Sequence, residues 1–152
     1  MERGLHYIPL DPKTWKVMVF TDGSFANNKD LSSQIGYVVC LVNEKRTEDR
    51  FTIRGNIIHW SSVKCKRVTR SVLASEIYGT AAGIDTGYVV TQTINMVTDH
   101  LGLPKIPLIV CTDSYSLYEC LVKLGSTMEK RLMIDVMMMR QMYEQREIEE
   151  IR

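Results

Sequence analysis

The chain has 152 residues, of which 45% are hydrophobic and 24% charged, and its formal net charge is +1. This length is typical of one domain that buries about two thirds of the surface of its unfolded chain. The charge balance argues against a strongly basic nucleic-acid coat, although a local basic patch remains compatible with it. No segment reaches the ~18 uninterrupted apolar residues of a membrane span, and the N-terminus lacks the apolar core of a signal peptide. We therefore expect a single domain over residues 1–152, an intracellular location and no membrane partner.

The first part of the chain has the pattern of a three-stranded meander. The run from Val17 to Phe20 is continuously apolar, which indicates a buried strand. Short connections between successive strands favour antiparallel pairing. We predict strands over residues 16–21, 35–42 and 50–58, a polar loop over 23–34 and a turn over 43–46.

The hydrophobic period then changes to that of a helix. Leu73, Ile77 and Ala81 recur at every fourth position, and Thr69 or Ser71 is suited to cap this helix. We predict a break at the glycines 83 and 87 and a second helical stretch over 88–100. A parallel strand over 106–112 and a helix over 114–124 should follow. A capping box at 126–129 should open a last helix, and a fifth strand should start over 148–151. The last helix should bury one face made of Leu132, Val136, Met139 and Tyr143.

These elements predict an α/β fold with a mixed sheet flanked by helices. The sheet combines an antiparallel three-strand meander with a parallel strand, which should lie beside the first strand. The carboxyl ends of those two strands then adjoin.

Three acidic residues occupy positions that suit a metal centre. Asp22 and Asp113 each follow an apolar strand, preceded by threonine and followed by a small residue, so both should lie at one edge of the sheet. Glu76 lies inside the intervening helix, beside the apolar Val72 and Leu73, where an unpaired carboxylate would be unfavourable. Three converging carboxylates form a cage for hard divalent cations, as used in metal-assisted phosphodiester hydrolysis. A turn role for Asp22 and a helix-capping role for Asp113 are the alternatives.

The ordered motifs resemble those of the ribonuclease H domain of retroelement polyproteins, in particular the copia-type retrotransposon branch. They are Phe-Thr-Asp-Gly-Ser-Phe at 20–25, Trp-Ser-Ser-x-Lys at 60–64, Val-Thr-Arg-Ser at 68–71, Ala-Ser-Glu-Ile-Tyr at 74–78, Cys-Thr-Asp-Ser at 111–114 and Lys-Arg-Leu-Met-Ile-Asp at 130–135. The resemblance covers roughly residues 15–145 and implies a ribonuclease H-like fold.

The resemblance also implies hydrolysis of the RNA strand of an RNA–DNA hybrid during reverse transcription. It assigns Asp22, Glu76 and Asp113 as ligands of two Mg²⁺ (or Mn²⁺) ions, one activating the attacking water and the other stabilising the leaving oxygen. The implied partners are the hybrid and an adjacent reverse transcriptase domain. The family has a fourth carboxylate after its fifth strand. Because the chain ends at Arg152, we expect a truncated C-terminal strand and helix, and a fragment of a longer polyprotein.

Several further residues are candidates for contacts with a substrate. Hydroxyl groups and backbone beside the acids suit hydrogen bonds to RNA 2′-hydroxyls or phosphates; these candidates are Gly23, Ser24, Arg70, Ser71 and Ser114. Four cations fall within seven residues and suit backbone phosphates, with a solvated loop as the alternative: Lys64, Lys66, Arg67 and Arg70. For Trp60 we favour packing in the core or at a sheet edge over stacking on a base, and for Asp135 a salt bridge or a solvated position.

Two other functions remain open on the sequence alone. One is a ribonuclease H-like module that is inactive or truncated and binds nucleic acid or protein without cutting. The other is an integrase or transposase, which also uses an acidic triad but typically carries the last acid on a later helix.

Overall fold

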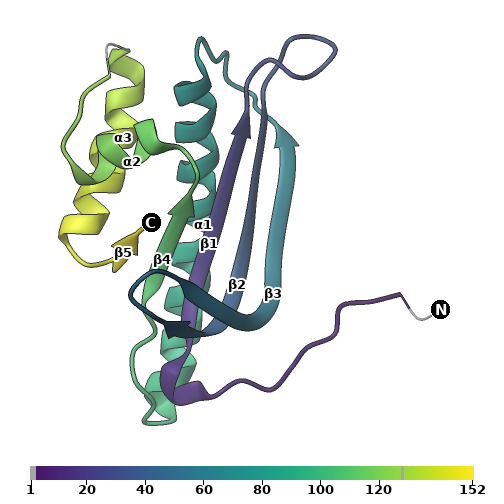
Figure 1. Ribbon diagram of the computed structural model, residues 1–152, viewed down its shortest axis with the longest axis vertical. Coiled ribbons are helices and arrows are strands. Elements are labelled where there is room, and N and C mark those ends of the chain that lie inside the picture. Colours follow the sequence, from purple (N-terminus) through teal and green to yellow (C-terminus); the bar gives the residue numbers. More distant parts are fainter. Residues whose placement is uncertain (1–2, 128) are drawn as a thin grey trace.

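A five-stranded mixed sheet forms the centre of the molecule, with the strand order β3-β2-β1-β4-β5 (Figure 1). The computed structural model describes residues 3–127 and 129–152. The strands are β1 (Lys16–Ser24), β2 (Gln34–Arg46), β3 (Phe51–Lys64), β4 (Leu108–Thr112) and β5 (Glu150–Ile151). Antiparallel pairing joins β1 to β2 and β2 to β3, whereas β4 runs parallel to both β1 and β5. The predicted meander, the parallel fourth strand beside the first and the start of a fifth strand are all confirmed.

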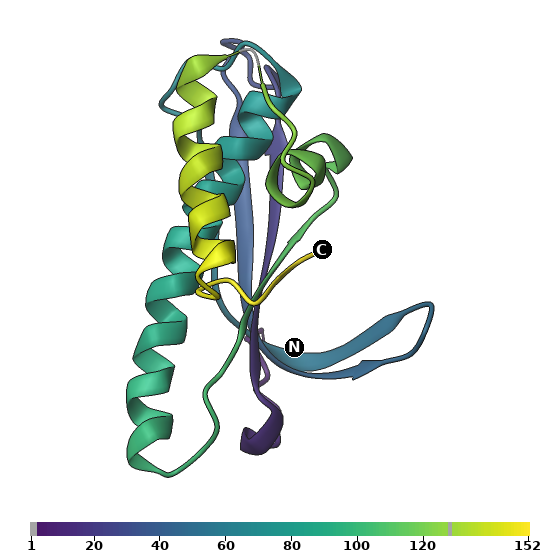
Figure 2. The same cartoon turned by 90° about the vertical axis from the view of Figure 1, so that its left-hand side faces the viewer.

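Helices α1 (Val72–His100) and α3 (Lys130–Glu144) lie on one side of the sheet (Figure 2). A shorter helix, α2 (Tyr115–Val122), follows β4, and a 3-10 turn (Pro12–Thr14) precedes β1. The main core lies between α1, α3 and the sheet and includes Val17, Val19 and Val110. As predicted, α3 buries Leu132, Val136 and Met139, and the half-buried Tyr143 packs against the same core. Among the described residues, no helix is both long and apolar enough to span a bilayer.

The hairpin of β2 and β3 is longer than predicted and bends away from the helices (Figure 2). The predicted turn over 43–46 is wrong, because those residues continue β2 and the connection lies at 47–50. Asn43 and Glu44 in this segment have distant side-chain partners. The Asn43 side chain donates to the carbonyl of Asp11 at 2.9 Å, and the Glu44 carboxylate accepts from Lys16 at 2.8 Å and from Arg152 at 2.5 Å. Polar residues that indicate a turn locally are therefore accommodated inside a strand.

Helix α1 is continuous, so the predicted break at Gly83 and Gly87 is wrong. Both glycines face β1 at close range. A Cβ atom on Gly83 would lie 2.8 Å from Cγ2 of Thr21, and one on Gly87 would lie 2.4 Å from Cγ2 of Val19. The glycines lower helix propensity locally, but tertiary packing outweighs that effect and uses the missing side chains to bring helix and sheet together.

Smaller differences concern the ends of elements. The predicted loop over 23–34 begins later, because β1 continues to Ser24. Helix α2 ends at Val122, and Leu124 adopts a left-handed backbone conformation with φ of 58°. The predicted capping box is wrong in its described part: α3 begins at Lys130, and Glu129 at its N-cap makes no capping side-chain bond to a described residue. Met128, inside that motif, lies outside the described residues.

Candidate metal centre

The three predicted acids come together at one edge of the sheet. Asp22 lies near the end of β1, Asp113 directly follows β4, and Glu76 is the fifth residue of α1. Each offers a carboxylate oxygen, and the three oxygen atoms lie within 4.8 Å of one another. The structure thus confirms the predicted convergence of the three side chains.

Backbone geometry explains why the carboxylates meet. In the parallel register of β1 and β4, Thr21 is paired with Thr112, so the aspartates that follow these two residues lie side by side. The first turns of α1 lie directly on Gly23. A Cβ atom there would lie 2.6 Å from both the carbonyl carbon and the carbonyl oxygen of Ser75. Only glycine therefore permits this approach, which brings Glu76 to the two aspartates.

The electrostatic environment of Glu76 is unusual for a carboxylate. The residue is only 6% exposed, and its Oε2 atom has no hydrogen-bond partner among the described residues. Burial raises the pKa of Glu76 to about 7, and the negative charges of Asp113 and Asp22 act in the same direction. A hydrogen bond from the backbone N–H of Gly23 opposes them without cancelling them. Asp22 and Asp113 themselves are exposed.

A buried carboxylate oxygen without a partner is an unfavourable arrangement unless something compensates its charge. A hard divalent cation does this directly, because carboxylate oxygens are its preferred protein ligands. The donor set of Asp22, Glu76 and Asp113 therefore fits such an ion.

The serines beside the acids take part in local structure. Ser71 is the N-cap of α1 and accepts from the N–H of Ala74 at 3.1 Å. Ser114, and not Asp113, is the N-cap of α2 and accepts from the N–H of Leu117 at 3.3 Å. The capping alternative for Asp113 is thereby wrong, and its carboxylate is left to the cluster.

The other predicted substrate contacts lie around the same edge. Ser24 accepts from the side-chain amide of Asn27 at 2.6 Å, whereas Gly23 is buried beneath α1 and Arg70 is exposed.

The basic segment before α1 is partly neutralised. Lys64 pairs with Asp30. Arg67 pairs with Asp135 at 3.3 Å and lies over the ring of Tyr78, 4.9 Å from its centroid. The predicted salt bridge of Asp135 is thus confirmed. Two further cations, at positions 66 and 70, are exposed and form no ion pair with a described residue.

Trp60 lies at a sheet edge, one of the two positions expected for it, and is not packed in the core. It lies on β3, an edge strand, and 61% of its surface is exposed. The third strand was predicted over 50–58, but β3 continues past Trp60 to Lys64.

Sequence reasoning missed a buried contact between Thr21 and Thr80, whose hydroxyl oxygens lie 2.8 Å apart. The signal available was the spacing of Thr80, one helical turn after Glu76. Nothing in the local pattern indicated its partner.

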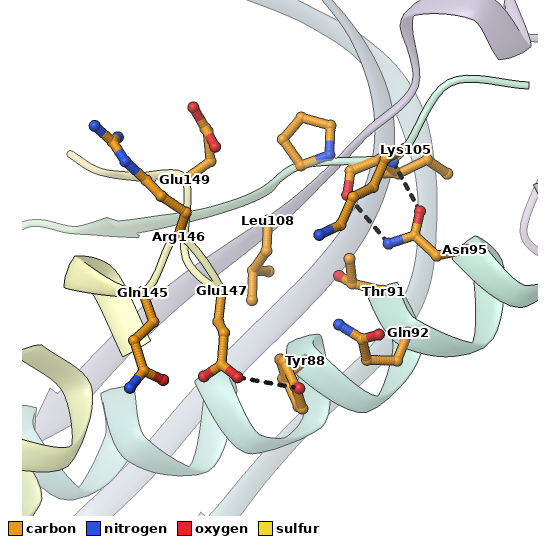
Figure 3. A pocket seen from close by; sticks show the side chains of 12 residues that line it. Tyr88, Thr91, Gln92, Asn95, Lys105, Leu108, Gln145, Arg146, Glu147 and Glu149 are labelled. Carbon is orange, nitrogen blue, oxygen red and sulfur yellow. Dashed lines mark hydrogen bonds between the residues drawn. The ribbon is translucent and has the colours of Figure 1, made fainter. Parts of the chain in front are cut away.

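A separate cavity of about 470 Å³ lies between α1, the start of β4 and the segment after α3 (Figure 3). It is about 16 Å from the carboxylates, since Leu108 in its wall and Asp113 are five residues apart on an extended strand. In its wall, the Asn95 side chain accepts from the N–H of Ile106 at 2.8 Å, and Tyr88 donates to Glu147 at 3.4 Å. The first bond joins α1 to the entry to β4, and the second joins α1 to the segment after α3.

Comparison with solved structures identifies the fold as ribonuclease H-like. Ribonuclease H1 from Halobacterium salinarum NRC-1 superposes with a TM-score of 0.54 at 15% identity, covering 90% of this chain and 81% of that one. LC11 ribonuclease H1, solved in complex with an RNA/DNA hybrid, gives 0.55 at 18% identity with the same coverage. The foamy viral protease–reverse transcriptase, solved with double-stranded DNA, gives 0.54 at 16% identity, covering 95% of this chain and 84% of that one. No protein-family profile and no curated protein matches the chain.

Proposed function

We propose that this chain is a divalent-metal-dependent endonuclease that cleaves the RNA strand of RNA–DNA hybrids. The observation that carries the proposal is the convergence of Asp22, Glu76 and Asp113 within 4.8 Å, with a buried oxygen of Glu76 left without a partner among the described residues. The ribonuclease H-like fold supports it, because the structures of this fold named above include one solved with an RNA/DNA hybrid.

The three carboxylates have different parts in this proposal. Glu76 provides a buried anchoring oxygen from the helix, and the exposed Asp22 and Asp113 leave the cluster open on the side from which a polynucleotide arrives. Bound Mg²⁺ or Mn²⁺, in the two-ion arrangement expected for this fold, supplies an activated water and stabilises the leaving oxygen. The protein groups hold the ions and orient the phosphodiester, so no side-chain nucleophile is required.

Residues around the cluster are proposed to hold the substrate. The hydroxyls of Ser71 and Ser114 accept helix N–H bonds, so each O–H proton remains available to a phosphate or 2′-hydroxyl oxygen. Ser24 lies on the same edge, whereas Gly23 is buried beneath α1 and its N–H donates to Glu76. The exposed Arg70 offers a charge for a backbone phosphate.

We also propose that the chain is a single domain of the copia-type retrotransposon branch, acting in reverse transcription beside a reverse transcriptase domain. The ordered motifs around the three acids support the branch. The outer face of α3 supports a protein partner, because Ile134 and Met137 are 73% and 61% exposed there.

Cleavage of a labelled RNA–DNA hybrid in the presence of Mg²⁺ or Mn²⁺ tests the proposal. The Asp22→Asn variant should reduce cleavage to the level seen with EDTA. The matched control is Asp99→Asn, since Asp99 is an exposed carboxylate near the far end of α1. Equal activity of Asp22→Asn and wild type would refute the site. A wild-type protein that binds the hybrid without cutting it, with either metal, would instead establish the alternative of a non-cleaving binding module.

A further inference from the structure

The hydroxyl of Thr21 connects the three elements that carry the carboxylates. Its Oγ1 lies 2.8 Å from Oγ1 of Thr80 on α1 and donates at 3.5 Å to the carbonyl of Cys111 on β4. Thr21 is 6% exposed and Thr80 is fully buried. Since water has little access, the hydrogen bond between them meets little competition from solvent.

Each atom in this contact is close in sequence to one acid of the cluster. Thr21 directly precedes Asp22 on β1. Thr80 lies one turn after Glu76 on the same helix face, since residues four apart are neighbours on a helix. The carbonyl that accepts from Thr21 belongs to Cys111, two positions before Asp113. A displacement of α1 from β1 would therefore move Glu76 relative to both aspartates and stretch the threonine contact at the same time.

We infer that Thr21 and Thr80 form a positioning pair that holds the three carboxylates at metal-binding distance. The inference rests on the proposed function. Like charges at this distance repel, and the repulsion acts to lift the start of α1 from the sheet. Backbone hydrogen bonds hold β1 to β4, but those within α1 do not join it to the sheet. The buried contact between Thr21 and Thr80 opposes the displacement of α1 from β1. It lies where Gly83 allows the helix to approach the strand closely.

Three substitutions isolate the hydroxyl contact from general stability. Thr80→Val removes the hydroxyl and preserves the shape, whereas Thr80→Ser retains the hydroxyl. The matched control is Thr91→Val: Thr91 is also buried on α1, but its hydroxyl donates to the carbonyl of Gly87 within the helix at 2.7 Å. It lies eleven residues from Thr80, about 16 Å along the helix.

Mn²⁺ affinity is measured by titration calorimetry on protein shown by urea unfolding to be folded. We expect Thr80→Val to weaken Mn²⁺ binding about tenfold, as changes behind a metal ligand typically do. In hybrid cleavage, kcat should fall while KM for the hybrid stays within twofold. The Mn²⁺ affinities of Thr80→Ser and Thr91→Val should both stay within twofold of wild type. This should hold for Thr91→Val even if that variant is less stable than Thr80→Val.

Hydrogen exchange in metal-free protein gives a readout that does not depend on metal binding or catalysis. Thr80→Val should accelerate amide exchange across residues 75–80 more than Thr91→Val does. If Thr80→Val does not fold, Thr21→Val should give the same losses. Unchanged Mn²⁺ affinity or unchanged exchange in whichever of these two variants folds would overturn the inference. A wild type that fails to bind Mn²⁺ would refute the proposed function, and the exchange comparison would still decide whether the threonines hold the helix in place.

Discussion

Replacing Glu76 with glutamine should stabilise the metal-free protein above neutral pH. Burial and the charges of Asp113 and Asp22 raise the pKa of Glu76 from 4.5 to about 7. Between these two values the folded protein retains a proton that the unfolded chain has released. Stability therefore falls as the pH rises from about 4.5 to about 7, and stays at the lower level above that window. Glutamine is neutral throughout and should lack this decline.

The expected size follows from the same values. A pKa raised from 4.5 to about 7 corresponds to roughly 3 kcal/mol of unfolding free energy between pH 4 and pH 8. Glutamine introduces a buried amide donor without an evident partner, which costs about 1–3 kcal/mol. The Glu76→Gln variant should thus be more stable than wild type by about 1 kcal/mol at pH 8, and less stable at pH 5, where the wild-type carboxyl is protonated.

Urea unfolding followed by circular dichroism at pH 5, 6, 7 and 8 in EDTA measures this difference. Excess Mg²⁺ should reverse the order at pH 8, because a ligand at 100 times its Kd stabilises the protein that binds it by about 2.7 kcal/mol. The control Asp99→Asn should follow the wild-type curve. A Glu76→Gln variant whose difference from wild type does not change with pH would refute the assignment of Glu76 as the buried, strained member of the cluster.

Three further predictions concern the supporting structure. Gly23→Ala should destabilise the protein more than Gly87→Ala in urea unfolding. The methyl group added at position 23 would lie 2.6 Å from backbone atoms, whereas the one added at position 87 would meet a side chain. Overpacking costs about 1–3 kcal/mol even where side chains can shift. Glu44→Gln should cost about 3 kcal/mol at pH 7, as expected for breaking a buried ion pair. The cationic partners of Glu44 lower its pKa to about 2. The stability that the Glu44 carboxylate contributes is therefore lost as the pH falls through that value, and the difference between Glu44→Gln and wild type should shrink. Replacing both Lys66 and Arg70 with glutamine should reduce the slope of log Kd for hybrid against log salt by up to about 2, roughly one for each phosphate that is no longer neutralised; an unchanged slope would remove both residues from the interface.

Local patterns were sufficient to predict the carboxylate cluster. The apolar runs before Asp22 and Asp113 indicated strand ends, and the helical period around Glu76 placed it between them. With β4 reached by a crossover, parallel pairing followed, and it brings strand ends to a common edge. The position of each acid depended on residues within a few positions of it, and the crossover rule supplied the pairing of the strands.

The errors arose where distant residues decide the local structure. The polar segment at 43–46 has the composition of a turn, but Glu44 is held in a strand by Arg152, which is 108 positions away. Gly83 and Gly87 have the composition of a helix break, but they give α1 its close contact with β1. In each case a weak local preference was outweighed by a tertiary contact that the sequence pattern does not reveal.

The arrangement of the cluster has an energetic consequence that separates a metal centre from a purely structural group of acids. Strand register and close glycine packing hold Asp22, Glu76 and Asp113 together through the backbone, so their mutual repulsion persists in the metal-free protein and lowers its stability. A substitution that removes one charge relieves that repulsion and also removes a ligand. For Glu76, the neutral variant should therefore gain stability above neutral pH while losing metal affinity. In a structural cluster held by internal hydrogen bonds, the same substitution would lower stability, and the sign of that change distinguishes the two.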